Sequence, residues 1–279
     1  IIVMDYFMAT LTQINVYPIK SLGGIALSHA YVGETGLAFD RQLMLVDKSG
    51  KFVTARKWPH LLGFQPLLND DGWIVISPEG ARLSIRKSQF EQIVDVNIWR
   101  HDMQASCADE TINQWFSDAL AQDVRLVSVA NESIRLVENS AQPLAFSDGY
   151  PLLIIGEDSL NELNHRASEP SVMAQFRTNL VFDGAPAFIE DTWKLIRIGD
   201  VEFEFVKPCE RCVMTTVNMG DYSFRKSKEP LATLKTFRAD SKGRLMFGEN
   251  LIARNNGMIS VGDELEVIAT HQPLHYGKK

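Results

Sequence analysis

Two cysteines, Cys209 and Cys212, are separated by two residues and flanked by positive charge. Lys207 and Arg211 stand beside them, and a neighbouring cation favours the thiolate form of cysteine. The thiolate is the form that binds metals and attacks electrophiles. The spacing therefore indicates a reactive or metal-binding thiolate.

The segments on either side of the pair indicate where it lies in the fold. Residues 201–206 alternate apolar and acidic side chains, which is typical of a half-buried strand. Residues 213–217 are rich in β-branched side chains and also predict a strand. Because Pro208 cannot donate to a strand ladder, we expect the cysteines in a bend or loop at the mouth of a sheet.

The residues alone leave several interpretations of the pair open. A zinc site normally needs four nitrogen or sulfur ligands, whereas one further cysteine, Cys107, and six scattered histidines are present. A thioredoxin-like redox pair usually begins a helix, which the strand expected after the pair disfavours. Inert buried cysteines are the third interpretation.

Polar residues elsewhere could bind an anion. Lys20 and Ser21 follow a predicted strand, where the ammonium and the hydroxyl can hold a phosphate, and Arg41 lies further along the chain. Arg177 and Asn179 are two residues apart, so strand alternation would put both on one face. A guanidinium beside an amide suits a phosphate or the edge of a heterocycle.

One carboxylate, Asp148, lies in a Ser-Asp-Gly-Tyr-Pro turn directly before a buried strand. Considered by itself, such a turn favours a structural role, because aspartate side chains commonly accept hydrogen bonds from turn backbone.

The elements that must position these residues are mostly short strands separated by turns. The first half predicts strands at residues 11–17, 43–47, 73–77 and 124–129, with a helix at 109–121. The second half predicts a strand at 151–155 that enters a helix ending near 164. Further strands are predicted at 178–182, 195–198, 201–206 and 213–217. A helix from 229 to 234, with Pro230 in its first turn, and a turn and final strand at 257–268 follow. We predict an α+β, β-rich fold of β-barrel type with a few short helices, and a boundary or hinge at residues 130–142.

Composition limits the function classes. The chain has 279 residues, 45% hydrophobic and 23% charged, as expected of one large domain or two intimate ones. A net charge of -7 argues against nucleic-acid binding over a broad basic surface, but it allows a local basic pocket. Three cysteines predict a reducing, cytoplasmic location, and we find no apolar run long enough to span a membrane.

Five segments, taken in order, resemble the MOSC-domain molybdenum proteins. They are Tyr-Pro-Ile-Lys-Ser at 17–21, Asp-Arg at 40–41, Ser-Asp-Gly-Tyr-Pro-Leu-Leu at 147–153, Phe-Arg-Thr-Asn at 176–179 and Cys-Glu-Arg-Cys-Val-Met-Thr-Thr at 209–216. The resemblance is closer to the amidoxime-reducing branch, and it runs from about residue 11 to residue 267. It implies a MOSC N-terminal β-barrel domain at 9–129, a MOSC domain with the molybdenum cofactor site at 130–270, and a tail or linker at 271–279.

The resemblance also implies roles for single residues. Cys212 corresponds to the cysteine that ligates molybdenum, and Asp148 corresponds to an aspartate beside the metal. The contacts to molybdopterin and its phosphate fall on Lys20, Ser21, Arg41, Arg177 and Asn179, and we add Arg211 to this set. The chain departs from the family pattern at Gly149 and Tyr150, where small hydroxyl residues are frequent, and at Asn218 and Met219, where some relatives have Asp-Pro.

The implied activity is a molybdenum-dependent reductase of N-hydroxylated compounds, such as amidoximes, N-hydroxypurines and hydroxylamines. The oxygen atom would be removed at the cysteine-ligated metal, and Asp148 would donate a proton or orient the substrate. The reaction would detoxify N-hydroxylated bases. The alternatives are a carrier module for the cofactor or for sulfur, related to the C-terminal domain of cofactor sulfurases, and a zinc-binding or disulfide-exchanging protein.

Electrons must come from a donor. Because no cysteine follows Cys212, we expect no iron–sulfur cluster within the 279 residues. The resemblance implies either a separate iron–sulfur or haem protein or a [2Fe–2S] domain beyond residue 279.

Overall fold

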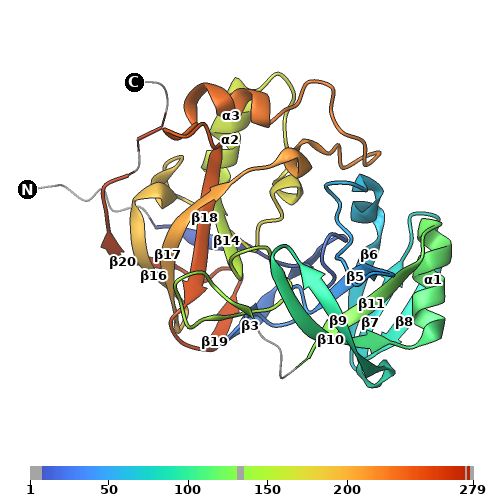
Figure 1. The fold of residues 1–279 in the computed structure, drawn as a ribbon. Helices are drawn as coiled ribbons and strands as arrows, with labels where there is room; N and C mark the ends of the chain where they lie inside the picture. Colours follow the sequence, from blue (N-terminus) through green and yellow to red (C-terminus); the bar gives the residue numbers. More distant parts are fainter. Residues whose placement is uncertain (1–7, 131–134, 274, 277–279) are drawn as a thin grey trace, which may run out of the picture.

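The computed structural model describes residues 8–130, 135–273 and 275–276. Its largest unit is a curled eight-stranded sheet with the order β2-β1-β15-β14-β18-β17-β16-β20 (Figure 1). Neighbours in this sheet pair antiparallel except for β14 and β15, which are parallel. The strands in this order are Ile25–Leu27, Thr10–Val16, Leu180–Asp183, Leu152–Gly156, Met246–Ala253, Val201–Glu210, Trp193–Ile198 and Leu265–Thr270.

A second lobe is built mostly from residues 43–129. A four-stranded sheet has the order β5-β11-β10-β9, with bounds Leu43–Asp47, Val124–Val129, His101–Ala108 and Phe90–Ile98. A three-stranded meander adds β6 (Gln65–Asn69), β7 (Gly72–Ile76) and β8 (Arg82–Arg86). Helix α1 (Glu110–Leu120) covers this lobe and buries Ile112, Phe116 and Leu120 against it, as the helical apolar stripe predicts.

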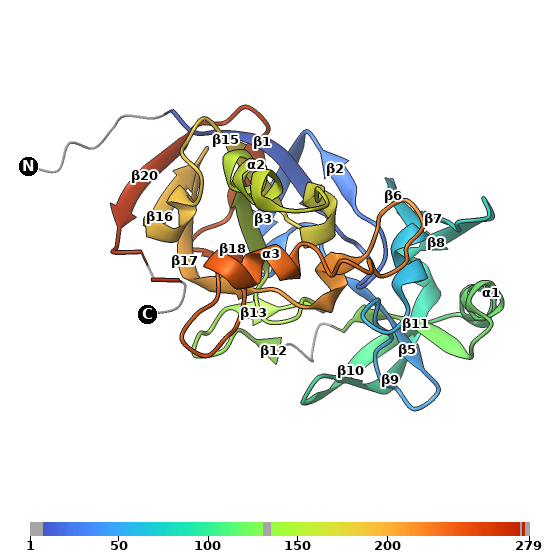
Figure 2. The same ribbon diagram turned by 90° about the horizontal axis from the view of Figure 1, so that it is seen from above.

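Two short helices cover one end of the large sheet. Helix α2 (Glu157–Arg166) follows β14 directly, and α3 (Leu231–Phe237) packs beside it (Figure 2). Smaller pairings complete the fold: β19 (Gly257–Ser260) with β3 (His29–Gly33) and β4 (Gly36–Leu37), and β12 (Arg135–Leu136) with β13 (Pro143–Leu144). The strand-rich α+β prediction with a few short helices is therefore confirmed.

The two halves of the chain are interleaved. Strands β1 and β2 belong to the large sheet of the second half, and β3 pairs with β19 near the C-terminal end. The loop after β1, which carries Lys20 and Ser21, is thereby fixed against both lobes. The domain limits 9–129, 130–270 and 271–279 stay predictions, and residues 131–134, 274 and 277–279 lie outside the described part of the chain.

Two predictions around the cysteine pair are wrong. Residues Val213–Thr216 form a 3-10 turn instead of a strand. The Thr215 hydroxyl donates to the Cys212 carbonyl at 2.9 Å, and the Thr216 hydroxyl donates to the Val213 carbonyl at 2.7 Å. Such local bonds compete with a strand ladder, and they outweigh the β propensity of these side chains.

The other error concerns Pro208, which does not end its strand. Strand β17 continues to Glu210, with register shifts between Phe205 and Lys207 and between Pro208 and Glu210. These irregularities accommodate the missing N–H of the proline. Cys209 therefore lies within β17, and only Cys212 lies beyond its end.

Smaller differences concern element limits. Strand β15 begins at Leu180, so Arg177 and Asn179 precede it, and the expected strand alternation does not relate them. Helix α3 begins at Leu231, one residue after Pro230, and residues 257–268 contain two strands, β19 and the start of β20. Within the described residues, no helix combines the length and apolarity needed to cross a membrane.

A buried acidic cluster lies where α3 meets the large sheet. Arg238 binds both oxygens of Asp191, at 2.5 and 2.9 Å, and Ser159 donates to Glu190 at 2.9 Å. Glu249 on β18 is 5% exposed. Burial, together with the carboxylates of Asp191 and Glu190, raises the pKa of Glu249 to about 9. Glu249 therefore carries a proton at neutral pH.

This proton predicts the pH dependence of stability. A carboxyl group whose pKa is higher in the native state than in the unfolded state favours folding at low pH, and this contribution is lost as pH rises from about 4.5 toward 9. Each unit of difference is worth about 1.4 kcal/mol. We expect Glu249→Gln, which keeps the neutral shape, to flatten the decline of unfolding free energy between pH 5 and pH 9, measured by denaturant titration at several pH values. The surface variant Glu110→Gln is the control, and an equal decline in Glu249→Gln and the parent would contradict the assignment.

Candidate functional site

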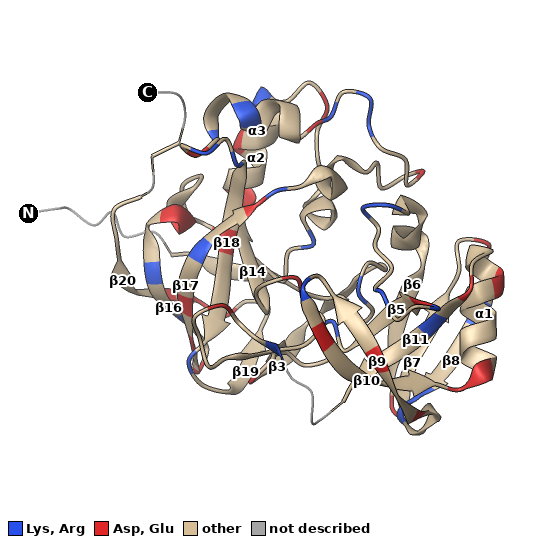
Figure 3. Ribbon diagram, in the orientation of Figure 1, with Lys and Arg blue, Asp and Glu red and all other residues tan. Residues whose placement is uncertain are grey.

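A cavity of about 310 Å³ lies between the two lobes and is lined by residues from both. The structure brings together in it all eight residues singled out from the sequence: Lys20, Ser21, Arg41, Asp148, Arg177, Asn179, Arg211 and Cys212. Figure 3 shows that several Lys and Arg positions lie on the loops between the lobes. These residues come from segments far apart in sequence, so the fold itself assembles the cavity.

Strained backbone occurs at three of the lining residues. Ser21, Arg41 and Arg177 have φ values of 72°, 47° and 54°, in the left-handed region that non-glycine residues rarely occupy. Each such residue costs of order 1–3 kcal/mol and persists only where its surroundings hold it. The strain directs these side chains toward one place, which is typical of a binding or catalytic site.

Two guanidinium groups stack on one aromatic ring. The ring of Tyr17 lies 4.5 Å from the Arg41 guanidinium and 4.1 Å from that of Arg177. Arg41 donates to Asp40 at 2.5 Å and to Asn179 Oδ1 at 3.1 Å. Burial and the nearby charge of Arg41 together lower the pKa of Arg177 to about 10. The cavity wall thus holds positive charge that is only partly neutralised.

Two buried arginines in this wall each have one nitrogen without a hydrogen-bond partner among the described residues. Arg177 Nη1 donates to the Leu22 carbonyl at 2.6 Å, while Arg177 Nη2 is unpaired. Arg211 donates to the carbonyls of Phe247 and Phe176 at 2.7 and 3.2 Å, while its Nη2 is unpaired. Leaving a buried donor unsatisfied is costly, so the wall is suited to an anionic ligand with several acceptor oxygens.

Asp148 contacts side chains from both lobes. Its carboxylate pairs with the Lys20 ammonium and accepts from Arg56 Nη2 at 2.7 Å and Trp99 Nε1 at 3.2 Å. Arg135 holds the loop that carries Asp148, because its Nη2 donates to the carbonyl of Ala145 at 2.7 Å and to that of Ser147. Burial alone would raise the pKa of Asp148, but Lys20 and Arg56 hold it well below its usual range.

Lys20 has the complementary environment. Burial lowers the pKa of its ammonium to about 8, although the charge of Asp148 opposes this shift. Its Nζ also donates to the Phe146 carbonyl at 2.8 Å. Lys20 can therefore exchange a proton near neutral pH, whereas Asp148 stays ionised.

The two cysteines differ in their surroundings. Cys212 Sγ accepts a hydrogen bond from Arg56 Nε at 3.3 Å. Cys209 packs with Phe176, Phe247 and their neighbours, and burial raises the pKa of its thiol. Among the residues that the structure describes, no group of three or more His, Cys, Asp and Glu side chains converges to hold a metal ion.

Two further cavity residues, Arg56 and Gln175, were not indicated by the sequence. Arg56 contacts both Asp148 and Cys212, but it lies in a Thr-Ala-Arg-Lys stretch with no recognisable pattern. Gln175 lines the cavity two residues before Arg177, and its amide donates to the Thr215 carbonyl at 2.8 Å. Only its proximity to Arg177 could have indicated it.

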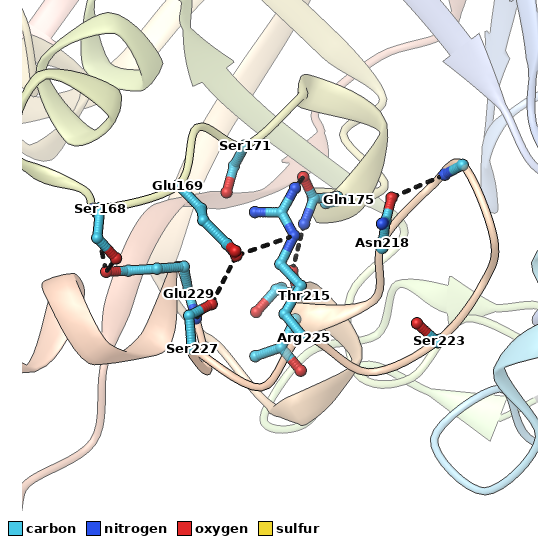
Figure 4. A network of polar contacts seen from close by, with 12 residues as sticks. Ser168, Glu169, Ser171, Gln175, Thr215, Asn218, Ser223, Arg225, Ser227 and Glu229 are labelled. Carbon is cyan, nitrogen blue, oxygen red and sulfur yellow. Dashed lines mark hydrogen bonds and ion pairs between the residues drawn. The ribbon is translucent and has the colours of Figure 1, made fainter.

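An outer network of polar contacts, which includes Glu169, Arg225, Gln175 and Thr215, lies beside the cavity (Figure 4). Gln175 Oε1 accepts from the backbone N–H of Val172 at 2.9 Å and from Arg225 Nη2 at 3.4 Å. Glu169 lies 3.9 Å from Arg225 Nε. Through Gln175 and Thr215, the network joins the turn Met173–Phe176 to the turn Val213–Thr216. The Gln175–Thr215 hydrogen bond, which lies at the cavity wall, thus helps to fix the spacing of Arg177 and Cys212.

Comparison with known proteins matches almost the whole chain. Residues 8–123 match the MOSC N-terminal beta barrel domain, and residues 141–266 match the MOSC domain. Mitochondrial amidoxime-reducing component 1 of Mus musculus is 30% identical over 94% of this chain and 83% of its own length. Mitochondrial amidoxime reducing component 2 of Bos taurus is 32% identical, covering 92% of this chain and 82% of that protein.

A third relative is organised differently. Molybdenum cofactor sulfurase of Oryza sativa subsp. japonica is 29% identical over 85% of this chain, which corresponds to 32% of that protein. The similarity therefore covers about a third of the sulfurase and most of each amidoxime-reducing component.

The unpaired arginine nitrogens predict that the cavity binds anions, which can be measured without enzymatic activity. An anion that binds the native cavity stabilises it, by about 1–3 kcal/mol at concentrations tens of times its Kd. We expect millimolar pyrophosphate to raise Tm by a few degrees, measured by differential scanning fluorimetry at constant ionic strength, and Arg177→Gln to abolish most of this increase. Arg166→Gln, on the exposed face of α2, is the matched control. The same pyrophosphate effect in Arg177→Gln and the parent would contradict anion binding in this cavity.

Proposed function

The chain belongs to the MOSC-domain family, and we propose that it is a reductase that uses the molybdenum cofactor to remove oxygen from N-hydroxylated compounds. Amidoximes, N-hydroxypurines and hydroxylamines are the substrate class. The observation that supports this most is the presence of Cys212 and of six basic side chains around one cavity, in a chain similar to amidoxime-reducing components over nine tenths of its length.

The residues of the cavity fit this cofactor. Molybdopterin carries a phosphate and a dithiolene, so its site needs cations for the phosphate and one protein thiolate for the metal. The unpaired N–H groups of Arg177 and Arg211 could donate hydrogen bonds to the phosphate, and Lys20 and Arg41 add positive charge. Cys212 would supply the thiolate, with Ser21 and Asn179 as hydrogen-bonding groups near the pterin. No set of three or more His, Cys, Asp and Glu side chains converges within the described part of the chain, which agrees with a metal held mainly by its own cofactor.

When bound, the cofactor supplies the two-electron chemistry that breaks an N–O bond. Two electrons and two protons convert an amidoxime into an amidine and water. Asp148, ionised because of Lys20 and Arg56, would accept a hydrogen bond from a substrate N–H or O–H and so orient it. Its low pKa favours this role over that of proton donor. The Lys20 ammonium, with a pKa of about 8, is better suited to release a proton toward the cavity.

Electrons would come from a separate iron–sulfur or haem protein, or from a [2Fe–2S] domain beyond residue 279. We keep the cytoplasmic location and a role in detoxifying N-hydroxylated bases as parts of this proposal.

A second candidate function is supported by the similarity to the rice cofactor sulfurase. In that case the chain would carry the cofactor, or sulfur for it, without reducing a substrate. A protein that retains its cofactor through purification and turns over an amidoxime repeatedly with an artificial electron donor would exclude this carrier role.

The two cysteines provide the test of the reductase. With protein from a cofactor-producing host and reduced methyl viologen as donor, we expect Cys212→Ala to lower benzamidoxime reduction by more than about 100-fold, because it removes the ligand of the metal itself. Cys209→Ala, which changes the other thiol of the same motif, should stay within a few-fold of the parent. Unchanged turnover in Cys212→Ala would refute the assignment.

A further inference from the structure

Arg56 links the two side chains on which the proposed chemistry depends. Its Nε donates to Cys212 Sγ at 3.3 Å, and its Nη2 donates to Asp148 Oδ2 at 2.7 Å. Arg56 comes from the first half of the chain, whereas both of its partners come from the second half. One planar guanidinium thus sets the distance between the sulfur and the carboxylate.

The guanidinium is itself held in place. It lies over the ring of Trp99 with 4.5 Å between the guanidinium carbon and the ring centroid, and the Trp99 indole also donates to Asp148. Trp99 occupies the turn between β9 and β10 with a φ of 58°, and its ring contacts Phe52 at 4.8 Å between centroids. The tip of the β9–β10 hairpin therefore contacts both Arg56 and Asp148 and helps to hold them in place.

Such an arrangement has a defined effect on a metal thiolate. A hydrogen bond to a ligating sulfur withdraws electron density from it, so the more electron-rich reduced state of the metal gains most. Groups that orient a metal ligand in this way typically change metal affinity or activity by 10–100-fold when removed. Among the described residues, Arg56 is the cation that contacts the Cys212 sulfur.

We propose that Arg56 is a positioning residue for the metal-binding sulfur: it holds Cys212 at a fixed place relative to Asp148 and raises the reduction potential of the metal bound there. This inference rests on the proposed function, because it requires a metal at Cys212. It gives the N-terminal lobe a part in tuning the metal, beyond holding the phosphate and pterin of the cofactor.

The test compares variants of the full chain purified with cofactor. Molybdenum content is measured by mass spectrometry, and the midpoint potential of the molybdenum couple by redox titration followed by electron paramagnetic resonance. We expect Arg56→Gln to shift the midpoint potential to a lower value and to change the resonance spectrum, with activity about 10–100-fold lower. Arg56→Lys, which keeps the charge but not the fork of donors, should lie between the two.

Arg86→Gln is the matched control. This arginine belongs to the same lobe, is exposed and forms one long ion pair with Asp71 at 4.0 Å, so its potential should equal that of the parent. Loss of molybdenum from Arg56→Gln with retention in Arg56→Lys would also support the inference. If Arg56→Gln does not fold, Trp99→Leu, which keeps Arg56 but removes the supporting ring and its hydrogen bond to Asp148, should lower the potential in the same direction.

Parental molybdenum content, potential and spectrum in Arg56→Gln would overturn the inference and leave the proposed function intact. For an unfolded Arg56→Gln, a parental potential in Trp99→Leu would have the same meaning. A parent chain that contains no molybdenum would instead refute the proposed function.

Discussion

Mutual repulsion among buried cations is the constraint on which this structure depends. Lys20, Arg177 and Arg211 are each at most 9% exposed and surround one cavity with Arg41, in a protein whose net charge is -7. Burying positive charge is unfavourable unless it is paired, and burial lowers the pKa of both Lys20 and Arg177. The fold must therefore hold these side chains together against their own electrostatics.

Several features of the fold serve this purpose. Two guanidinium groups lie against the ring of Tyr17, and main-chain carbonyls of Leu22, Phe176 and Phe247 accept hydrogen bonds from the arginines. Ser21, Arg41 and Arg177, which line the cavity, have left-handed backbone. The outer network around Gln175 keeps the two turns beside the cavity at a fixed separation. Charge that is gathered at such a cost, with donors left unpaired, is most simply explained by an anionic ligand that completes it.

The sequence allowed much of this site to be predicted. The β-rich fold follows from short alternating segments, and helix α1 from its apolar stripe. The family resemblance pointed to eight residues in distant segments, and all eight line one cavity. Periodicity alone could not have related these segments to one another. What periodicity missed has physical causes: the Thr215 and Thr216 hydroxyls close a 3-10 turn where β-branched residues predicted a strand, and register shifts allow Pro208 within β17. Arg56 was missed because its role arises from tertiary contacts with Cys212 and Asp148, which no local pattern encodes.

The central claim is that Cys212 is the protein's own ligand to a molybdenum held by molybdopterin in this cavity. Molybdenum-edge X-ray absorption on the purified chain tests it most directly, because it counts the sulfur atoms around the metal. We expect Cys212→Ser to remove one sulfur from the first coordination sphere and Cys209→Ser to keep the sulfur count of the parent. An unchanged sulfur count in Cys212→Ser, or the loss of a sulfur in Cys209→Ser, would contradict it.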